Sequence, residues 1–489
     1  MGICRREFGA CLLAATVRPT VAAGPRPKLL ILVLLEQLRA EALTTIQPQL
    51  SSGGFRKFFE KGAIFPNTLH LASTFSSTGI ATLATGTWPA QHGIVADLWY
   101  DRSSRRGLPP SDEHLLATTF AAQVAAERGR VAVVSLDRSH AGIFAGSGDA
   151  SLYWLDDEGR FATNNETPEW LTSFNGQRGA ETARNGKWMA LGVRPDAPPL
   201  RTFTYDGAHP RDFLNLYRAS PYAQSAQFDL AAEVIARERL GTGSAVDLLC
   251  IVVGSGGRLG YEVGGRSPLM QQLTLQLDRR LETFFGQLAR TPGEGNYNIA
   301  LAAAHGAPPE PAAEARERMS VHGEQLAGAI DQALSASGGG RVEKYIYPFL
   351  YLNIESGRDP EAVRLAAARA AIQNAAVAGF YTAGGACSVQ DGWERRFRNS
   401  FHWTRSGDVM LSYRPEYVES FGQNRGVSYG SLYNYDARVP MCFYGPQFRI
   451  GTFQQTVESV DLAPTLARAI GVAEPSSSIG RVLGEALAE

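Results

Sequence analysis

Two side chains that could take part in catalysis follow directly after apolar runs of the chain. Glu36 follows the run 29–35 (LLILVLL), and His305 follows the run 299–304 (IALAAA). A carboxylate and an imidazole can each bind a metal ion or transfer a proton. A glycine-rich segment, residues 254–261, follows a third run at 247–253 (DLLCIVV). Because ligands collect beyond the carboxyl ends of buried parallel strands, we expect the functional site at these three places.

Ser76 adds a hydroxyl to this set. It stands near the start of residues 75–94 (FSSTGIATLATGTWPAQHGI), where a helical pattern begins. Free N–H groups and the helix dipole at such a position favour a phosphoryl group and an alkoxide. Serine is also a preferred N-cap residue, and this second interpretation stays open. His305 could bind a metal, could activate Ser76 if a third group oriented its ring, or could simply bond to the backbone.

The elements that must position these residues follow an alternating pattern. Further apolar runs occur at 131–134 and 439–444, and helical patterns lie between the runs, at 79–83, 113–128, 228–240, 269–288 and 460–470. Strands that alternate with helices predict a doubly wound α/β sheet. Residues 150–225 and 340–410 break the alternation, and we interpret them as cap insertions over the functional edge of the sheet.

Composition limits the class of protein. The 489 residues are 44% hydrophobic and 19% charged, which is typical of a globular chain. Lys plus Arg number 47 and Asp plus Glu 48, a net charge of −1 that argues against a nucleic-acid-coating protein. The five cysteines have no spacing typical of a metal site or a disulfide framework.

The N-terminus resembles a twin-arginine export signal. Arg5 and Arg6 precede a short apolar run, 10–17, and small residues at 20–23. We therefore predict a signal peptide at 1–23 and an exported, periplasmic or extracellular protein. The apolar run is too short to span a bilayer, and we expect no integral membrane segment.

Residues 75–94 are similar to the nucleophile segment of the alkaline phosphatase superfamily, in which a Thr or Ser opens a helix and a TG-xx-P-xx-HGI signature follows. Other segments match the family in the expected order: 28–39, 97–102 (DLWYDR), 153–175, 304–307 (AHGA), 405–408 (RSGD), 433–445 and 460–470. The resemblance spans 28–489 and is closest to bacterial periplasmic alkaline phosphatases with a threonine nucleophile. Nucleotide pyrophosphatase/phosphodiesterases are more distant. The resemblance implies a central, mostly parallel sheet flanked by helices, and phosphoester hydrolysis by two zinc ions.

The metal-site positions that the resemblance implies are mostly changed. The Asp that ends the first strand is Glu36, the nucleophile is Ser76, and the His of the family's ADHG segment is retained as His305. Four of the seven positions have lost their ligand atom: Gly257 and Tyr261 replace the Asp and His of TDYxGH, Ala304 replaces the Asp of ADHG, and Tyr429 replaces the His of HGS. One zinc loses every protein ligand, and the other keeps Glu36, Ser76 and His305 as a weak residual site. We therefore expect at most one weakly bound metal.

The phosphate-binding positions also depart from the family. Asp97 stands where the family has an Asn that binds phosphoryl oxygens, and a carboxylate there would repel a phosphate. The family's Lys-x-Arg pair falls in 135–140 (SLDRSH). Without a gap its positions are Asp137 and Ser139, whereas a one-residue gap would put Arg138 in the Arg position.

We predict from these changes a phosphatase-like protein whose two-zinc catalysis is lost or weakened and which binds a small-molecule or phosphoester-like ligand in a capped cleft. The alternative is an active phosphatase or phosphodiesterase that uses Ser76 with one metal or rearranged ligands. Tyr261 and Tyr429 are expected to fill the volume of the missing ligands. The other histidines show no ligand-like spacing, and structural or surface roles are expected for them: His70, His92, His114, His140, His209, His322 and His402.

Overall fold

The structure is a computed structural model that describes residues 26–194, 196–313, 315–337, 339–388, 392–420 and 426–488. The export signal predicted at 1–23 lies outside these residues. The centre of the fold is a large sheet with the strand order β20-β2-β19-β11-β1-β10-β5-β6-β7, in which the edge strand β20 is Gly451–Thr452. Its middle is parallel and consists of β11 (Tyr297–Ala303), β1 (Leu29–Leu35), β10 (Asp247–Val253), β5 (Val131–Ser135) and β6 (Ser151–Leu155).

The runs that predicted strands form these central strands. Every residue of β1 and of β10 is buried, because helices cover both faces of the sheet. Alternate side chains enter two separate cores: Leu32 lies in one and Ile31 in the other. The α/β fold class expected from the sequence is confirmed.

Antiparallel strands border the parallel centre. β19 (Arg438–Tyr444) runs antiparallel to β11 and to β2 (Ala63–Leu69), so the run 439–444 is a strand of the opposite direction. At the other edge, β7 (Phe161–Thr163) pairs antiparallel with β6. Because β6 and β7 belong to the main sheet, the first part of the segment 150–225 extends the sheet.

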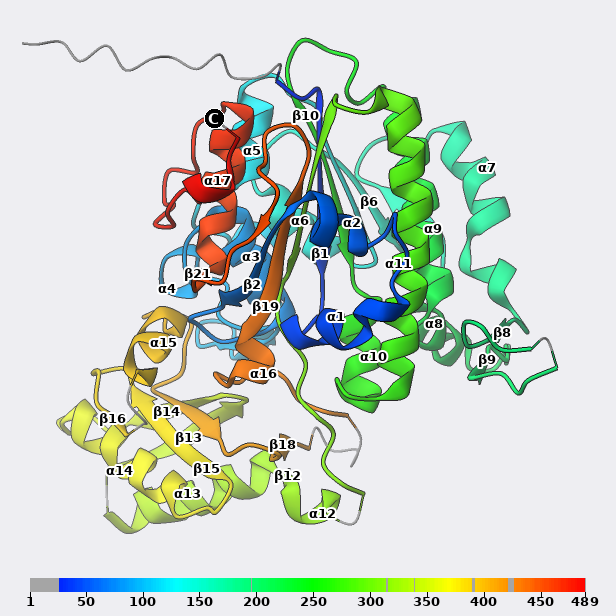
Figure 1. Cartoon of the computed structure of the whole chain (residues 1–489). Coiled ribbons are helices and arrows are strands. Elements are labelled where there is room, and N and C mark those ends of the chain that lie inside the picture. Colours follow the sequence, from blue (N-terminus) through cyan, green and yellow to red (C-terminus); the bar gives the residue numbers. More distant parts are fainter. Residues whose placement is uncertain are drawn as a thin grey trace, which may run out of the picture.

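Helices form a layer on each face of the sheet (Figure 1). One layer contains α3 (Ser76–Thr85), α5 (Phe120–Ala126), α6 (Arg138–Ala145) and α17 (Leu462–Ile470). The other contains α9 (Pro221–Arg237) and α11 (Pro268–Leu288). The pattern at 269–288 correctly predicted α11, whereas the single helix expected over 113–128 is wrong. A 3-10 turn, Asp112–His114, precedes α5, which begins where the Thr119 side chain accepts the Ala122 N–H.

A smaller lobe lies beside one end of the main sheet (Figure 1). Its five-stranded antiparallel sheet consists of β13 (Gly340–Ile346), β14 (Phe349–Ile354), β17 (Val409–Tyr413), β15 (Val377–Thr382) and β16 (Cys387–Ser388). Two helices pack on it, α13 (Gly323–Ser337) and α14 (Pro360–Ile372). The segment 340–410 thus contains nearly all of this second sheet. Among the described residues, no helix combines the length and the apolar character needed to cross a membrane.

Candidate functional site

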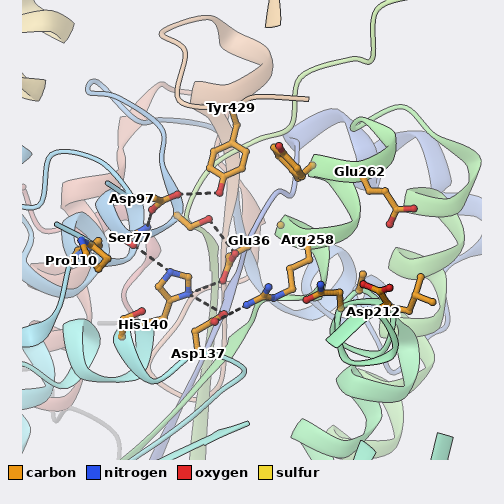
Figure 2. A pocket seen from close by; sticks show the side chains of 18 residues that line it. Glu36, Ser77, Asp97, Pro110, Asp137, His140, Asp212, Arg258, Glu262 and Tyr429 are labelled. Atoms are coloured by element: carbon orange, nitrogen blue, oxygen red, sulfur yellow. Dashed lines mark hydrogen bonds and ion pairs between the residues drawn. The ribbon is translucent and has the colours of Figure 1, made fainter. Parts of the chain in front are cut away.

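The candidate site lies at the carboxyl ends of four neighbouring parallel strands. His305 follows β11, Glu36 follows β1, α10 (Ser255–Val263) follows β10, and Asp137 follows β5. Because these strands are adjacent and parallel, the residues that follow them meet at one edge of the sheet, as the sequence predicted. Glu36, Asp137 and several residues of α10, among them Gly257 and Arg258, border a cavity of about 920 Å³ (Figure 2).

Glu36 is accommodated by a glycine face on α10. A Cβ atom at Gly257 would lie 2.3 Å from the Glu36 Oε2 atom, and one at Gly256 would lie 2.4 Å from the Glu36 main-chain oxygen. The longer Glu36 side chain therefore occupies the space that an Asp side chain at position 257 would need. The two departures from the family pattern, at positions 36 and 257, are sterically coupled.

Ser76 is the first residue of α3 and is buried among hydrogen-bonding partners. Its Oγ lies 3.1 Å from Glu36 Oε2 and 2.9 Å from His305 Nε2. The other ring nitrogen of His305, Nδ1, is 2.8 Å from the Gly306 carbonyl oxygen. A main-chain carbonyl thus orients the imidazole, a group that residue types alone do not reveal. Burial lowers the pKa of His305 to about 4, so its ring is neutral at neutral pH.

Asp97 places a carboxylate at the N-terminus of α3. Its Oδ1 accepts the Ser77 main-chain N–H at 2.9 Å, and its Oδ2 accepts the Tyr429 hydroxyl at 3.0 Å. A helix N-terminus is a natural anion site because its N–H groups are free. In this protein a side chain of the chain itself takes one of those N–H groups.

Tyr429 packs directly on the retained histidine. Its ring stacks on that of His305, with centroids 4.6 Å apart and an interplanar angle of 17°. Burial and the nearby Asp97 carboxylate raise the pKa of Tyr429 well above its usual value, which keeps the hydroxyl protonated as a donor. Tyr261 lines the same cavity, and a Cβ atom at Gly426 would lie only 2.3 Å from the Tyr261 ring. Both tyrosines thus occupy space at the site.

His140, on the first turn of α6, is a site residue that the sequence analysis missed. Its Nδ1 lies 3.0 Å from Glu36 Oε1 and 3.8 Å from Asp137 Oδ2, and its Nε2 lies 3.3 Å from Ser77 Oγ (Figure 2). We expected a structural role or a surface position for His140. Its place in the cavity wall contradicts a surface position. Burial alone would lower the pKa of His140, but the Glu36 carboxylate outweighs it and raises the pKa to about 9.

Arg258 on α10 is a second residue that was missed. Its guanidinium donates to Asp137 Oδ1 at 2.6 Å. Burial would raise the pKa of Asp137, but the positive charge of Arg258 lowers it. The local signal for His140 was its spacing from Asp137, i to i+3 directly after a strand. Arg258 had no local signal, because its partner is 121 residues away in the sequence.

Arg138 lies outside the site. Its side chain is exposed, and its guanidinium sits 5.5 Å from the centre of the Trp154 ring. Asp137 and Ser139 line the cavity instead. The structure thus places Asp137 and Ser139, and not Arg138, in the wall of this cavity.

The residues at the family's zinc positions do not fit two zinc ions. Gly257 and Ala304 offer no side-chain ligand atom, and the Tyr429 hydroxyl is bonded to Asp97. A residual set of Glu36, Ser76 and His305 stays together, but these groups already bond to one another. Typical catalytic zinc sites supply three protein ligands per ion, and this set offers three side chains for two ions.

The chain was compared with known proteins. Residues 30–426 match the family described as type I phosphodiesterase / nucleotide pyrophosphatase. The chain is 24% identical to the alkaline phosphatase PafA of Elizabethkingia meningoseptica, over 95% of each chain. It is 26% identical to the alkaline phosphatase PhoV of Synechococcus elongatus, over 97% of this chain and 96% of that protein.

Solved structures agree on the fold. The crystal structure of wild-type PafA superposes with a TM-score of 0.84 at 21% identity, covering 95% of this chain and 99% of that one. The murine ectonucleotide pyrophosphatase / phosphodiesterase 5 superposes with a TM-score of 0.60 at 13% identity, over 94% of this chain and 100% of that one. An inactive form of that mouse protein has been solved in complex with AMP. The chain therefore belongs to the type I phosphodiesterase / nucleotide pyrophosphatase family, within the alkaline phosphatase superfamily.

Proposed function

We propose that this protein is a family member that binds a small molecule in the 920 Å³ cavity and in which two-zinc phosphoester hydrolysis is lost or strongly weakened. In line with its N-terminal sequence, it would act outside the cytoplasm. The proposal concerns a site that keeps the position of the family's active site but has different chemistry.

The observation that supports the proposal most is the bonding of Asp97. Its carboxylate accepts the Ser77 N–H and the Tyr429 hydroxyl at the N-terminus of α3. A phosphoryl group next to Ser76 would need those same donors and would meet a negative charge instead. One main-chain donor at the start of α3 and the Tyr429 hydroxyl are therefore already bonded within the chain.

Ligand chemistry follows from the charges of the cavity wall. Carboxylates outnumber cations among the lining residues: Glu36, Asp97, Asp137, Asp212 and Glu262 against Arg258 and His140. A phosphate dianion is disfavoured, while hydroxyl and amine groups would find acceptors. A nucleoside or sugar-like molecule fits this pattern better than a free phosphate.

A second candidate function rests on the contact between Ser76 and His305. The 2.9 Å separation, with His305 held by the Gly306 carbonyl, resembles a nucleophile with its general base. Such chemistry would be hydrolysis by Ser76 with one metal or with none. It ranks second because Glu36 competes for the same hydroxyl proton at 3.1 Å and because the low pKa of His305 makes it a weak base.

Hydrolysis assays test the proposal. The purified chain, supplied with Zn²⁺, is assayed on a phosphate monoester and a phosphate diester beside its Ser76→Ala variant. We expect no turnover that depends on Ser76. Ser76-dependent turnover that a chelator abolishes would refute the proposal, and Ser76-dependent turnover that survives the chelator would establish the metal-free alternative.

A further inference from the structure

We propose that Glu36, Asp137 and His140 bind one divalent transition-metal ion, at a place that differs from both zinc positions implied by the family. Only Glu36 is shared with those positions. Asp137 and His140 come from the segment after β5, where the family resemblance implied phosphate-binding cations. The inference goes beyond the proposed function, because a single ion here is compatible with binding as well as with catalysis.

The three side chains converge on one point. One ligand atom from each residue lies within 4.8 Å of the others. His140 Nδ1 is central, 3.0 Å from Glu36 Oε1 and 3.8 Å from Asp137 Oδ2. A metal about 2.0–2.2 Å from each ligand keeps ligand atoms within about 4 Å of one another. A rotation of the partly exposed Asp137 carboxylate would bring its oxygen closer to the other two ligand atoms.

In each proposed ligand, the polar atom that does not face the metal position contacts a neighbouring side chain. Glu36 Oε2 accepts from Ser76 Oγ, Asp137 Oδ1 accepts from Arg258, and His140 Nε2 contacts Ser77 Oγ at 3.3 Å. Glu36 Oε1, Asp137 Oδ2 and His140 Nδ1 are thereby directed to the common point (Figure 2). Outer-shell bonds of this kind orient metal ligands and are a usual part of metal sites.

Two of these directed atoms lack a hydrogen bond. Within the described part of the chain, Glu36 Oε1 and His140 Nδ1 are buried and have no hydrogen-bond partner. They lie 3.0 Å apart and form an ion pair when the His140 ring is protonated, so a bound metal ion would displace the proton on Nδ1. Glu36 is itself only 7% exposed. Buried polar atoms are nearly always satisfied, so an ion between these atoms accounts for both of them.

The donor set indicates the type of ion. Two carboxylate oxygens and one imidazole nitrogen suit first-row ions such as Zn²⁺ and Mn²⁺ better than Mg²⁺ or Ca²⁺, which prefer oxygen alone. The two carboxylates offset the charge of one divalent ion. The ion would enter from the cavity, which all three residues line.

Metal titration of the full chain tests the inference. Zn²⁺, Mn²⁺ and Mg²⁺ are titrated separately by calorimetry, and bound metal is counted by elemental analysis after gel filtration. We expect one equivalent of Zn²⁺ or Mn²⁺. His140→Ala and Asp137→Asn should each weaken binding by more than ~100-fold, and Ser77→Ala by ~10-fold.

His305→Ala is the matched control, because His305 belongs to the residual family site and not to the proposed one. It should keep the bound ion. Loss of the ion in His305→Ala, with retention in His140→Ala, would overturn the inference and place the metal in the family position. No binding by the wild-type chain would also overturn it while leaving the proposed function intact, whereas two equivalents would contradict the proposed function. Thermal unfolding of each variant shows whether it is folded. If His140→Ala does not fold, the near-isosteric Asp137→Asn still tests the proposed site.

Discussion

Asp97→Asn tests the reasoning about the helix N-terminus. The amide is nearly isosteric, and its oxygen can still accept the Ser77 N–H that lies 2.9 Å from Asp97 Oδ1. The substitution removes the negative charge that faces any anion at the start of α3. We therefore expect the variant to bind inorganic phosphate more tightly than the wild-type chain.

The magnitude follows from the geometry. An oxyanion bound by the N–H groups of α3 would lie about 4 Å from the Asp97 carboxylate, where two unit charges repel by ~4 kcal/mol at an effective dielectric constant of about 20. Asp97 is partly exposed, so solvent and salt screen much of this repulsion. A gain of roughly 10–100-fold in affinity is expected, which corresponds to about 1.4–2.7 kcal/mol.

Calorimetric titration with inorganic phosphate at low and moderate salt measures the effect. Asp212→Asn is the matched control, because Asp212 also lines the cavity but lies on α8 (Pro210–Arg218), away from α3. Equal affinity in wild-type and Asp97→Asn protein, or an equal gain in both variants, would refute a specific role for Asp97. The gain should shrink as salt is raised.

Two stability predictions follow from packing and burial. Gly79→Ala would put a Cβ atom 2.0 Å from the Ala304 carbonyl oxygen, so we expect the free energy of unfolding to fall by ~3 kcal/mol or more in chemical denaturation. Gly176→Ala on α7 (Glu169–Arg178), where a Cβ atom would have nothing within 4 Å, should instead raise it by ~0.5–1 kcal/mol. Similar losses in both variants would contradict the packing argument. Burial raises the pKa of Asp436 to about 7 from 3.8, so the folded state holds this proton more tightly, and the group's effect on stability is lost as pH rises from about 4 to 7. The free energy of unfolding of Asp436→Asn relative to wild type should rise by on the order of 4 kcal/mol over that interval, and a constant difference would show that Asp436 does not titrate in this way.

The central strands were predictable because parallel strands buried on both faces read as unbroken apolar runs. β1 and β10 coincide with the runs 29–35 and 247–253 for this reason. Strand direction was not predictable in the same way, since β19 is as apolar as its neighbours but antiparallel to them. The helix expected over 113–128 was wrong because local capping by Thr119 begins α5 later than the apolar pattern suggests.

The site was predicted in part. The sequence indicated Glu36, Ser76 and His305, and the structure places Glu36 and His305 each within hydrogen-bonding distance of Ser76. It could not reveal Arg258 as a site residue, because its partner Asp137 follows another strand. His140 had one local signal, its spacing from Asp137, but its contact with Glu36 depends on the fold. The orientation of His305 by the Gly306 carbonyl was equally invisible, since every residue carries a main-chain carbonyl.

The central claim is that this chain has the family's fold without its two-zinc centre. Anomalous scattering from crystals grown with Zn²⁺ tests it most directly, because each bound ion gives its own peak. The account predicts a single peak among Glu36, Asp137 and His140, with none beside Tyr429. Two peaks about 4 Å apart next to Ser76, the spacing of two-metal sites, would contradict it.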